Sequence, residues 1–510
     1  MASENTKRIA KNTMMLYVRM LFTMFVSLYT SRVVLNVLGV EEYGIYNVIG
    51  GIIVMFSFIN VSMSSATSRF FTFELGKNSE KKLSQIFSGA MTIHIVIALF
   101  IFLLGETVGL WFLQNKLVIP ENRKFAALVV YQLSIFSTIV NITQVPYNAA
   151  IIAHERMHVY AYIEILNTLL KLLIVYLLVW FGGDKLILYG ILTFVVVVLI
   201  ALIYRIYCIR YFNECRYRFT WNKSLLIPML SFSGWDLYGN MSVVGRTQGV
   251  NMLLNIFFGT VLNAANGIAS QVQSAVMSFS GNILTAVRPQ IVKSYATGNV
   301  DYAVMLINNT AKFTYLLLLG ISLPLLLETH FVLKLWLKTV PEYAVIFCQL
   351  TLIFNFGANW SSVVVTGLHA AGKIKRPSLI NGSLYLLVVP ISYIVFKYGG
   401  KPDIPFWCNV FFVFIGCLLN VWALKIYLPQ FSVRNFIINV LGICIIITFL
   451  SIIPPLIVQM FFKEGILRLL IVGGVSVLSV VILSYFIGLD RDSRLMVKNK
   501  VSGFYSKLWR

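Results

Sequence analysis

Long apolar runs separated by short polar connections dominate this chain. A run of about 20 apolar residues spans the hydrocarbon core of a bilayer as a helix, and the sequence holds about fourteen such runs by that criterion. The pattern therefore predicts an all-α integral membrane protein with no room for a separate soluble domain. The expected spans cover residues 13–38, 44–68, 86–113, 125–148, 157–182, 186–211, 224–258, 260–287, 302–327, 343–369, 377–397, 404–427, 435–462 and 466–489.

The second third of the sequence repeats features of the first. The Leu-Asn pair that begins at Leu35 and precedes Gly39 reappears at Leu254 before Gly259, an offset of 219 positions for the pair, and Arg69 is matched by Arg288 at the same offset. Related bundles within one membrane protein are typical of transporters, whose ligand site lies at the repeat interface. The repeat therefore favours transport.

The composition agrees with a membrane protein and the charge indicates its orientation. The 510 residues are 58% hydrophobic and 12% charged, whereas soluble domains carry about 25% charged residues. With the N-terminus inside, 26 of the 41 Lys and Arg residues fall on the cytoplasmic side and 10 on the other. This is the positive-inside pattern. The net charge of +22 therefore orients the protein, with both termini cytoplasmic, and does not indicate a nucleic-acid partner.

Two motifs resemble catalytic or nucleotide sites. The segment His154–His158 fits H-E-x-x-H, a zinc metalloprotease pattern, but Glu164 lies too far along the same predicted helix, and Asp184 across the membrane, to complete the ligand set. The segment Gly367–Ile374 is close to a P-loop but lacks the final hydroxyl residue and follows a membrane span rather than a strand. We expect both to be structural turns.

The sequence offers little support for glycosyl transfer, a cleaved signal peptide or a cysteine-bound metal. Glu41 and Glu42 follow the first span, where some glycosyltransferases that use lipid-linked sugars place catalytic acids, but the sizeable outer loops that such enzymes need are absent from the sequence. No cleavable signal peptide is expected. The six cysteines lie mostly within spans without metal-ligand spacing, so we expect free thiols, no metal and no cofactor.

Charged residues within the spans are costly in a bilayer and usually face a cavity or a partner. The cations in the predicted spans are Arg19, Arg32, Lys171, Arg246 and Lys312. The acids are Glu164 and Asp236, with Glu106 and Glu328 near outer ends. We take Glu164 and Asp236 as candidates for ion coupling or for salt bridges with neighbouring cations.

Polar residues, most of them uncharged, follow helical faces in five spans, which favours a hydrated cavity, although each stripe alone could join helices. The stripes are Ser134, Ser137, Asn141, Gln144 and Asn148; Glu164, Thr168 and Lys171; Asp236, Asn240, Thr247 and Asn251; Asn263, Asn266, Ser270 and Ser274; and Asn355, Asn359, Ser362 and Thr366. An excess of cations over acids suits an anionic ligand, and arginine suits phosphate. Asn, Gln, Ser and Thr suit hydroxyl groups, so the combined chemistry describes a phosphate-linked sugar.

Four short motifs in order make the chain similar to the bacterial Wzx-type polysaccharide flippases, which share a superfamily with the multidrug and toxin extrusion (MATE) transporters and the lipid II flippases. The motifs are Leu38–Tyr46, Arg69 with Gly76, Ala153–Met157 and Ala371–Lys375. The resemblance implies a MATE-like fold with six-helix bundles at residues 1–212 and 224–428, two further helices at 429–490 and a basic cytoplasmic tail at 491–510.

The resemblance also implies an activity. It predicts a flippase, not an enzyme, that moves undecaprenyl-pyrophosphate-linked oligosaccharide repeat units across the bacterial cytoplasmic membrane. Membrane lipid and the polysaccharide polymerase machinery would be its further partners. The implied ligands for pyrophosphate and sugar acids are Arg19, Arg32, Lys171, Arg246 and Lys312. The alternative on the same fold is a cation-coupled exporter of small molecules, and the alternative of another class is an intramembrane zinc protease.

Overall fold

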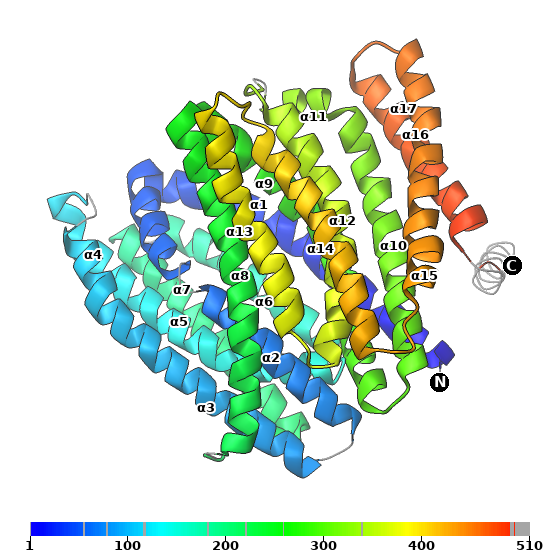
Figure 1. The fold of residues 1–510 in the computed structure, drawn as a ribbon. Helices are drawn as coiled ribbons and strands as arrows, with labels where there is room; N and C mark the ends of the chain where they lie inside the picture. The colour runs from blue at the N-terminus through cyan, green and yellow to red at the C-terminus, as the bar shows by residue number, and fades with distance from the viewer. Residues whose placement is uncertain are drawn as a thin grey trace, which may run out of the picture. The chain divides into compact units, whose positions relative to one another are not determined.

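The protein is an all-helical, multi-pass membrane protein (Figure 1). The computed structural model describes residues 2–54, 57–77, 80–115, 119–180, 183–219, 222–258, 260–337, 340–489 and 494. Ten helical segments in this described chain are long and apolar enough to cross a membrane. Helices suit that role because each satisfies its own backbone hydrogen bonds where no water is present.

The ten candidate spans correspond to ten of the predicted runs, and several limits agree closely. The run expected at 404–427 is the helix Ile404–Tyr427, and the run expected at 186–211 is Lys185–Tyr211. The other four predicted runs lie in further helices that are not among these ten candidate spans. They are the first helix pair of each sequence repeat.

The first helix differs from the expectation. We predicted a break between residues 38 and 44, but helix α1 runs without interruption from Ala2 to Val54. Proline is absent from the sequence before Pro120, so no residue there removes a helical hydrogen bond or clashes with the preceding turn. Glu41 and Glu42 consequently lie within a helix rather than in an outer loop, and Glu42 pairs with Arg123 at the start of α5.

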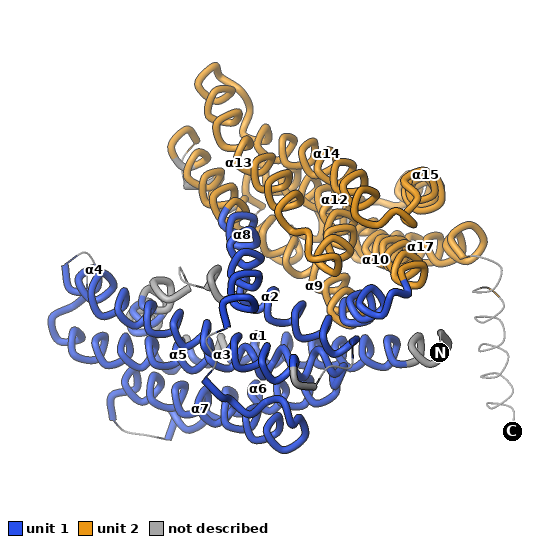
Figure 2. The backbone as a smooth tube through the Cα atoms, turned by 60° about the horizontal axis from the view of Figure 1, so that its bottom comes forward, with its two compact units in different colours: residues 1–241, 288–299 blue, residues 242–287, 300–510 orange. Residues whose placement is uncertain are grey.

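The chain divides into two compact units (Figure 2). Unit 1 contains residues 1–241 and 288–299, and unit 2 contains residues 242–287 and 300–510. Helices α8 (Lys223–Phe258) and α9 (Thr260–Ala296) each belong in part to both units. The predicted boundary between residues 212 and 224 falls in the connection before α8, whereas the units divide within α8 itself. Most of the tail 491–510 lies outside the described residues.

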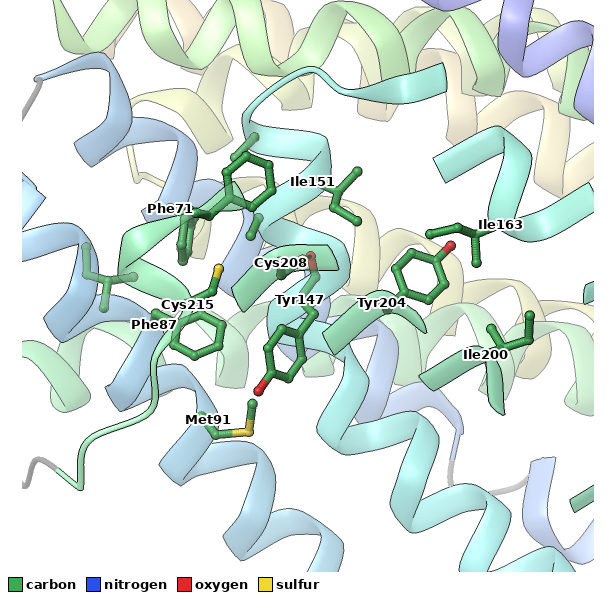
Figure 3. Packing of buried hydrophobic residues seen from close by; sticks show 14 of the residues in the cluster. Phe71, Phe87, Met91, Tyr147, Ile151, Ile163, Ile200, Tyr204, Cys208 and Cys215 are labelled. Carbon is green, nitrogen blue, oxygen red and sulfur yellow. Dashed lines mark hydrogen bonds between the residues drawn. The ribbon is translucent and has the colours of Figure 1, made fainter. Parts of the chain in front are cut away.

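Unit 1 packs around α5, which contacts α1, α2, α3, α6 and α7. One part of its core joins Phe71, Phe87, Tyr147, Tyr204 and Cys208 (Figure 3). Its other elements are α2 (Ser57–Gly76), α3 (Glu80–Leu104), a π-helical turn (Gly105–Gly109), α4 (Leu110–Asn115), a 3-10 turn (Glu121–Arg123), α5 (Lys124–Ala153), α6 (Met157–Trp180), α7 (Lys185–Tyr211) and a 3-10 turn (Asn213–Cys215).

Unit 2 packs around α12 (Ala344–Ala370), which contacts α10, α11 and α14 and is the most buried of the ten candidate spans. A helix surrounded by protein need not be apolar on every face, and α12 buries Asn355 and Asn359. The remaining elements are α10 (Val300–Leu327), α11 (Thr329–Leu337), α13 (Lys375–Lys397), α14 (Ile404–Tyr427), α15 (Val433–Phe436), a π-helical turn (Ile437–Gly442), α16 (Ile443–Phe461), α17 (Ile466–Leu483) and a π-helical turn (Ser484–Gly488).

Candidate functional site

A polar pocket of about 270 Å³ lies within unit 2. Four helices line it. α8 contributes Arg246, Thr247, Gln248, Val250 and Asn251, α9 contributes Asn263, Asn266, Gly267, Ser270 and Gln273, α12 contributes Leu350, Thr351 and Phe354, and α14 contributes Phe406 and Asn409.

Glycines on α8 set its position in unit 2. A Cβ atom on Gly249 would lie 2.7 Å from Val389 Cγ2, so this position needs a small residue for α8 to approach α13 this closely. One on Gly245 would lie 3.3 Å from Leu386 Cδ2, which is a tight contact. Small residues allow such close helix packing in membranes. With α8 held in this way, Arg246 and Asn251 are placed at the pocket.

A group of amides joins α8 to α9 at the pocket. Asn263 Nδ2 donates to Asn251 O at 3.1 Å and to Asn251 Oδ1 at 3.0 Å, and Asn266 Nδ2 donates to the same Oδ1 at 3.2 Å. Asn263 Oδ1 is buried and has no hydrogen-bond partner among the described residues. An unpartnered buried amide oxygen is costly, so it favours a ligand that brings a hydroxyl or an N–H group.

Arg246 is the charged residue of the pocket and is only 6% exposed. Its Nη1 donates to Asn409 Oδ1 at 3.1 Å. Its Cζ lies 4.9 Å from the centroid of the Phe354 ring and 4.4 Å from that of Tyr385. Stacking on aromatic faces holds the planar guanidinium in one orientation. Its Nε is buried and unpartnered in the described chain, so a donor remains for an anionic or polar ligand.

The lining therefore combines one buried cation, several amides and two phenylalanine rings, and it contains no carboxylate. Amide side chains both donate and accept hydrogen bonds, which suits hydroxyl groups, whereas the guanidinium suits an acidic group. The volume lies just below the ~300–1,000 Å³ of typical ligand pockets, so it fits one sugar unit rather than a whole oligosaccharide. In the described chain, no group of three or more His, Cys, Asp or Glu residues is placed to hold a metal ion.

The predicted cations occupy different surroundings. Arg19 on α1 lies 5.0 Å from the Tyr160 ring in unit 1. Lys171 on α6 is exposed. Lys312 on α10 donates from Nζ to Gly488 O at 3.2 Å, and it is not among the residues that line the pocket. The side chain of Arg32 lies outside the described residues. Of the five, Arg246 alone lines the described pocket.

The two predicted acids have neighbours in unit 1. Glu164 Oε1 accepts from the Tyr204 hydroxyl at 3.1 Å, and Arg19 and Glu164 both interact electrostatically with Tyr204. Asp236 Oδ2 accepts from Asn240 Nδ2 at 3.3 Å, and Arg288 is its nearby positive charge. In the described chain neither acid forms an ion pair within 4.0 Å, so both the coupling role and the salt-bridge role stay predictions.

The polar stripes divide between the pocket and helix contacts. Residues of the α8 and α9 stripes reach the pocket, among them Asn251, Asn263 and Ser270. The stripe on α12 does not line it, and Asn359 Nδ2 instead donates to Thr314 Oγ1 at 2.9 Å. In the α5 stripe, Ser134 and Ser137 bond to carbonyls of their own helix.

Several residues of the pocket were missed by the sequence analysis. Asn409 is one of two asparagines in the largely apolar run 404–427, and that rarity was a usable signal. Gln248 and Gln273 lie next to predicted stripe positions. Phe354 has no such signal, nor does Tyr385, which contacts Arg246 without lining the pocket, because aromatic residues are frequent along the whole chain.

The H-E-x-x-H segment is a turn between α5 and α6. α5 ends at Ala153 and α6 begins at Met157, so His154 and His158 do not share a helix face. His154 Nε2 lies 2.6 Å from Glu214 Oε1, and its ring stacks on Phe212 at 4.1 Å. Burial raises the pKa of Glu214, but the hydrogen bond with His154, a backbone hydrogen bond and the charge of His154 together lower it, and they leave that pKa below its usual value.

The comparisons with known proteins identify the fold. No family model and no curated protein matches the chain. Solved structures do match. The outward-facing conformation of a multidrug resistance MATE family transporter of the MOP superfamily has a TM-score of 0.72 at 10% identity, over 84% of this chain and 97% of that one.

Two further structures agree. MATE in its straight conformation has a TM-score of 0.71 at 10% identity, over 84% of this chain and 97% of its own. A MOP superfamily transporter from Pyrococcus furiosus, whose reversed binding-pocket polarity was taken to suggest a different function, has a TM-score of 0.68 at 11% identity, over 85% and 96%. The chain thus has the MATE-like fold of MOP superfamily transporters, and the predicted fold class is confirmed.

Proposed function

We propose that this protein is a flippase that moves undecaprenyl-pyrophosphate-linked oligosaccharide units across the bacterial cytoplasmic membrane. The MATE-like fold supports transport, and the observation that carries the choice of ligand is the pocket of unit 2. Its amide groups and buried Arg246 complement an acidic or hydroxyl-rich group, and a lining without a carboxylate offers no charge partner to a cationic drug.

In this proposal the pocket binds part of the polar headgroup while the polyprenyl tail stays in lipid. Arg246 holds an acidic group, and the amides of Asn251, Asn263, Asn266 and Asn409 bond to hydroxyl or N-acetyl groups. The pocket thereby replaces hydrogen bonds that the headgroup would lose on leaving water, which is the main cost of carrying it through hydrocarbon. Arg19, Arg32, Lys171 and Lys312 are secondary candidates, and both termini are cytoplasmic.

The second candidate function is a cation-coupled exporter of small molecules on the same fold. Asp236 favours it, since a carboxylate within a spanning helix is a common ion-binding group. Its neighbour Arg288 disfavours it, because an adjacent positive charge already balances the carboxylate. We therefore place the glycan-lipid flippase first.

Deletion of the gene tests the proposal. The account expects loss of surface polysaccharide, with the complete repeat unit accumulating on its lipid carrier. Wild type and His154→Ala should restore export, because His154 lies in a structural turn, whereas Arg246→Gln should not. Normal surface glycan together with altered drug sensitivity would support the exporter instead.

A further inference from the structure

Two cationic side chains lie over one tyrosine at one end of unit 2. Lys373 follows the last turn of α12, Arg376 lies in the first turn of α13, and Tyr427 is the last residue of α14. Lys373 Nζ is 5.7 Å and Arg376 Cζ is 5.4 Å from the centroid of the Tyr427 ring. Lys425 is two positions before Tyr427 and donates to Pro429 O at 2.5 Å. All three cations are exposed.

Two glycines of the P-loop-like segment Gly367–Ile374 shape the turn between α12 and α13. We call this turn, with Lys373, Arg376, Lys425 and Tyr427, the corner. A Cβ atom on Gly367 would lie 2.7 Å from Ile307 Cδ1 and 3.0 Å from Leu424 Cδ1, so α12 packs closely against α10 and α14 at this glycine. Gly372 has a φ of +72°, a left-handed conformation that ends the helix. The chain then turns directly into α13, which places Lys373 and Arg376 beside the end of α14.

Among the described residues, the three cations have no acidic partner. From residue 344 to residue 463 the sequence has a single acid, Asp403, which lies before α14 at the opposite end of that helix. One acid, Asp301 in the first turn of α10, does lie at the same end of unit 2 as the cations, because Ile307 of α10 packs against Gly367 of α12. It forms no ion pair with them in the described chain. In the described part of the chain, no ion pair involves Lys373, Arg376 or Lys425.

The opposite end of unit 2 differs in this respect. There, Arg468 Nη2 lies 2.8 Å from Glu328 Oε2, and His330 Nδ1 lies 3.1 Å from Glu464 Oε1. Two carboxylates at that end are therefore paired within the protein. The positive charge of Lys373, Arg376 and Lys425 is left for a ligand.

Apolar neighbours place the cations at the edge of the membrane-spanning region. Trp422 is 64% exposed and Ile426 is 45% exposed on α14, beside Lys425 and Tyr427. Exposed aromatic and apolar residues followed by Lys and Arg mark the level of the lipid headgroups. Phosphate groups of the lipid lie at that level, and basic residues between helix ends bind anionic headgroups there.

We propose that Lys373, Arg376 and Lys425 bind the phosphate of an anionic phospholipid, with Tyr427 orienting the first two side chains. A nucleotide fits the corner poorly, since Ile374 is buried and offers no hydroxyl for a metal-bound phosphate. The lipid site does not depend on the proposed transport function.

Native mass spectrometry of the full-length protein tests this site. The protein is released from nanodiscs of phosphatidylcholine and phosphatidylglycerol, and the bound lipid is measured. Wild type is expected to retain phosphatidylglycerol in preference to phosphatidylcholine. K373Q/R376Q should weaken that retention by about tenfold, because two cations near the headgroup are lost.

Matched variants separate charge from folding. K397Q/K401Q, at the other end of α13, removes the same charge and should retain the lipid as wild type does. K373R/R376K keeps both charges and should also retain it. Equal retention by K373Q/R376Q and wild type would overturn the proposal. Displacement of the lipid by inorganic phosphate or ATP would also overturn it, because the corner would then be a site for free anions.

Discussion

Lys293 Nζ donates to Glu155 Oε1 at 2.7 Å and ties the end of α9 to the turn between α5 and α6 within unit 1. Gln290 Nε2 donates to Glu155 Oε2 at 2.6 Å, and Arg8 Nη2 lies 3.0 Å from the same oxygen. The Glu155 side chain is 1% exposed, and its φ is 58°, in the left-handed region. Left-handed backbone costs about 1–3 kcal/mol, so these bonds offset a local strain.

Replacing Glu155 with Ala should destabilise the protein strongly. The change removes the acceptor of three donors and leaves Lys293 half-buried without its partner, and breaking a buried pair costs about 3–5 kcal/mol. The thermal unfolding temperature in detergent measures the effect. Glu121→Ala is the control, because Glu121 pairs with Lys124 on the surface with 86% of its side chain exposed. Similar unfolding temperatures for both variants would show that Glu155 does not anchor α9.

The contact between α10 and the last two helices depends on Glu328. This residue is 1% exposed, and it accepts from Arg468 Nη2 at 2.8 Å and from Gln459 Nε2 at 2.9 Å. Arg468→Leu leaves the carboxylate buried without its cation and should cost about 3–5 kcal/mol. Adding Glu328→Gln should recover part of that loss, since the remaining group is neutral. Additive effects in this double-mutant cycle would contradict a direct pair.

Arg246 should contribute to transport through the shape of its guanidinium as well as through its charge. Arg246→Gln should lower export by about tenfold or more, since a hydrogen bond to a charged group is worth about 1.5–3 kcal/mol. Arg246→Lys keeps the charge but cannot stack on Phe354 and Tyr385 in the same way, so it should restore export only in part. Complementation of the deletion strain measures both.

Lys397→Gln is the control for Arg246, because its side chain is exposed at the end of α13 and does not line the pocket. It should export normally. Full export by Arg246→Gln, at the same protein level in the membrane, would show that the pocket does not bind the transported ligand.

Glu214 should make stability depend on pH in the acid range. Its pKa is lower in the folded protein than its usual value, so the folded state releases the proton more readily. The stabilisation is therefore present above the usual glutamate pKa of about 4.3 and is lost as pH falls through the lower folded value. Glu214 is partly exposed, so the effect should stay below about 1 kcal/mol.

Comparison with Glu214→Gln isolates this effect. Near neutral pH the wild type should unfold at a higher temperature than the variant, and the difference should vanish at acid pH. A difference that grew on acidification would contradict the sign of the pKa shift.

Hydropathy predicted the fold well, because the bilayer imposes helix length and apolar composition directly. The limits of α7 and α14 show this most clearly. The break expected after Leu38 failed because Gly39 and Gly44 weaken a helix without ending it, and no proline follows them before Pro120. The division of α8 between the units was equally beyond a hydropathy pattern, since it depends on packing between distant segments.

The candidate site was predicted in part. Periodicity placed Asn251, Asn263 and Asn266 on helix faces, and all three line the pocket. It did not distinguish them from Asn359, which bonds to α10, because a polar stripe looks the same whether it meets a cavity or a neighbouring helix. Lys312 was grouped with Arg246 for its charge alone, although its ammonium bonds to Gly488 O.

Transbilayer movement of a fluorescent undecaprenyl-pyrophosphate-linked oligosaccharide in vesicles containing the purified protein tests the central claim most directly. The account predicts that the protein makes the glycan of the inner leaflet accessible to an external glycosidase, and that Arg246→Gln vesicles resemble protein-free ones. Equal accessibility with and without the protein, in vesicles where the protein still transports a cationic dye, would contradict the account.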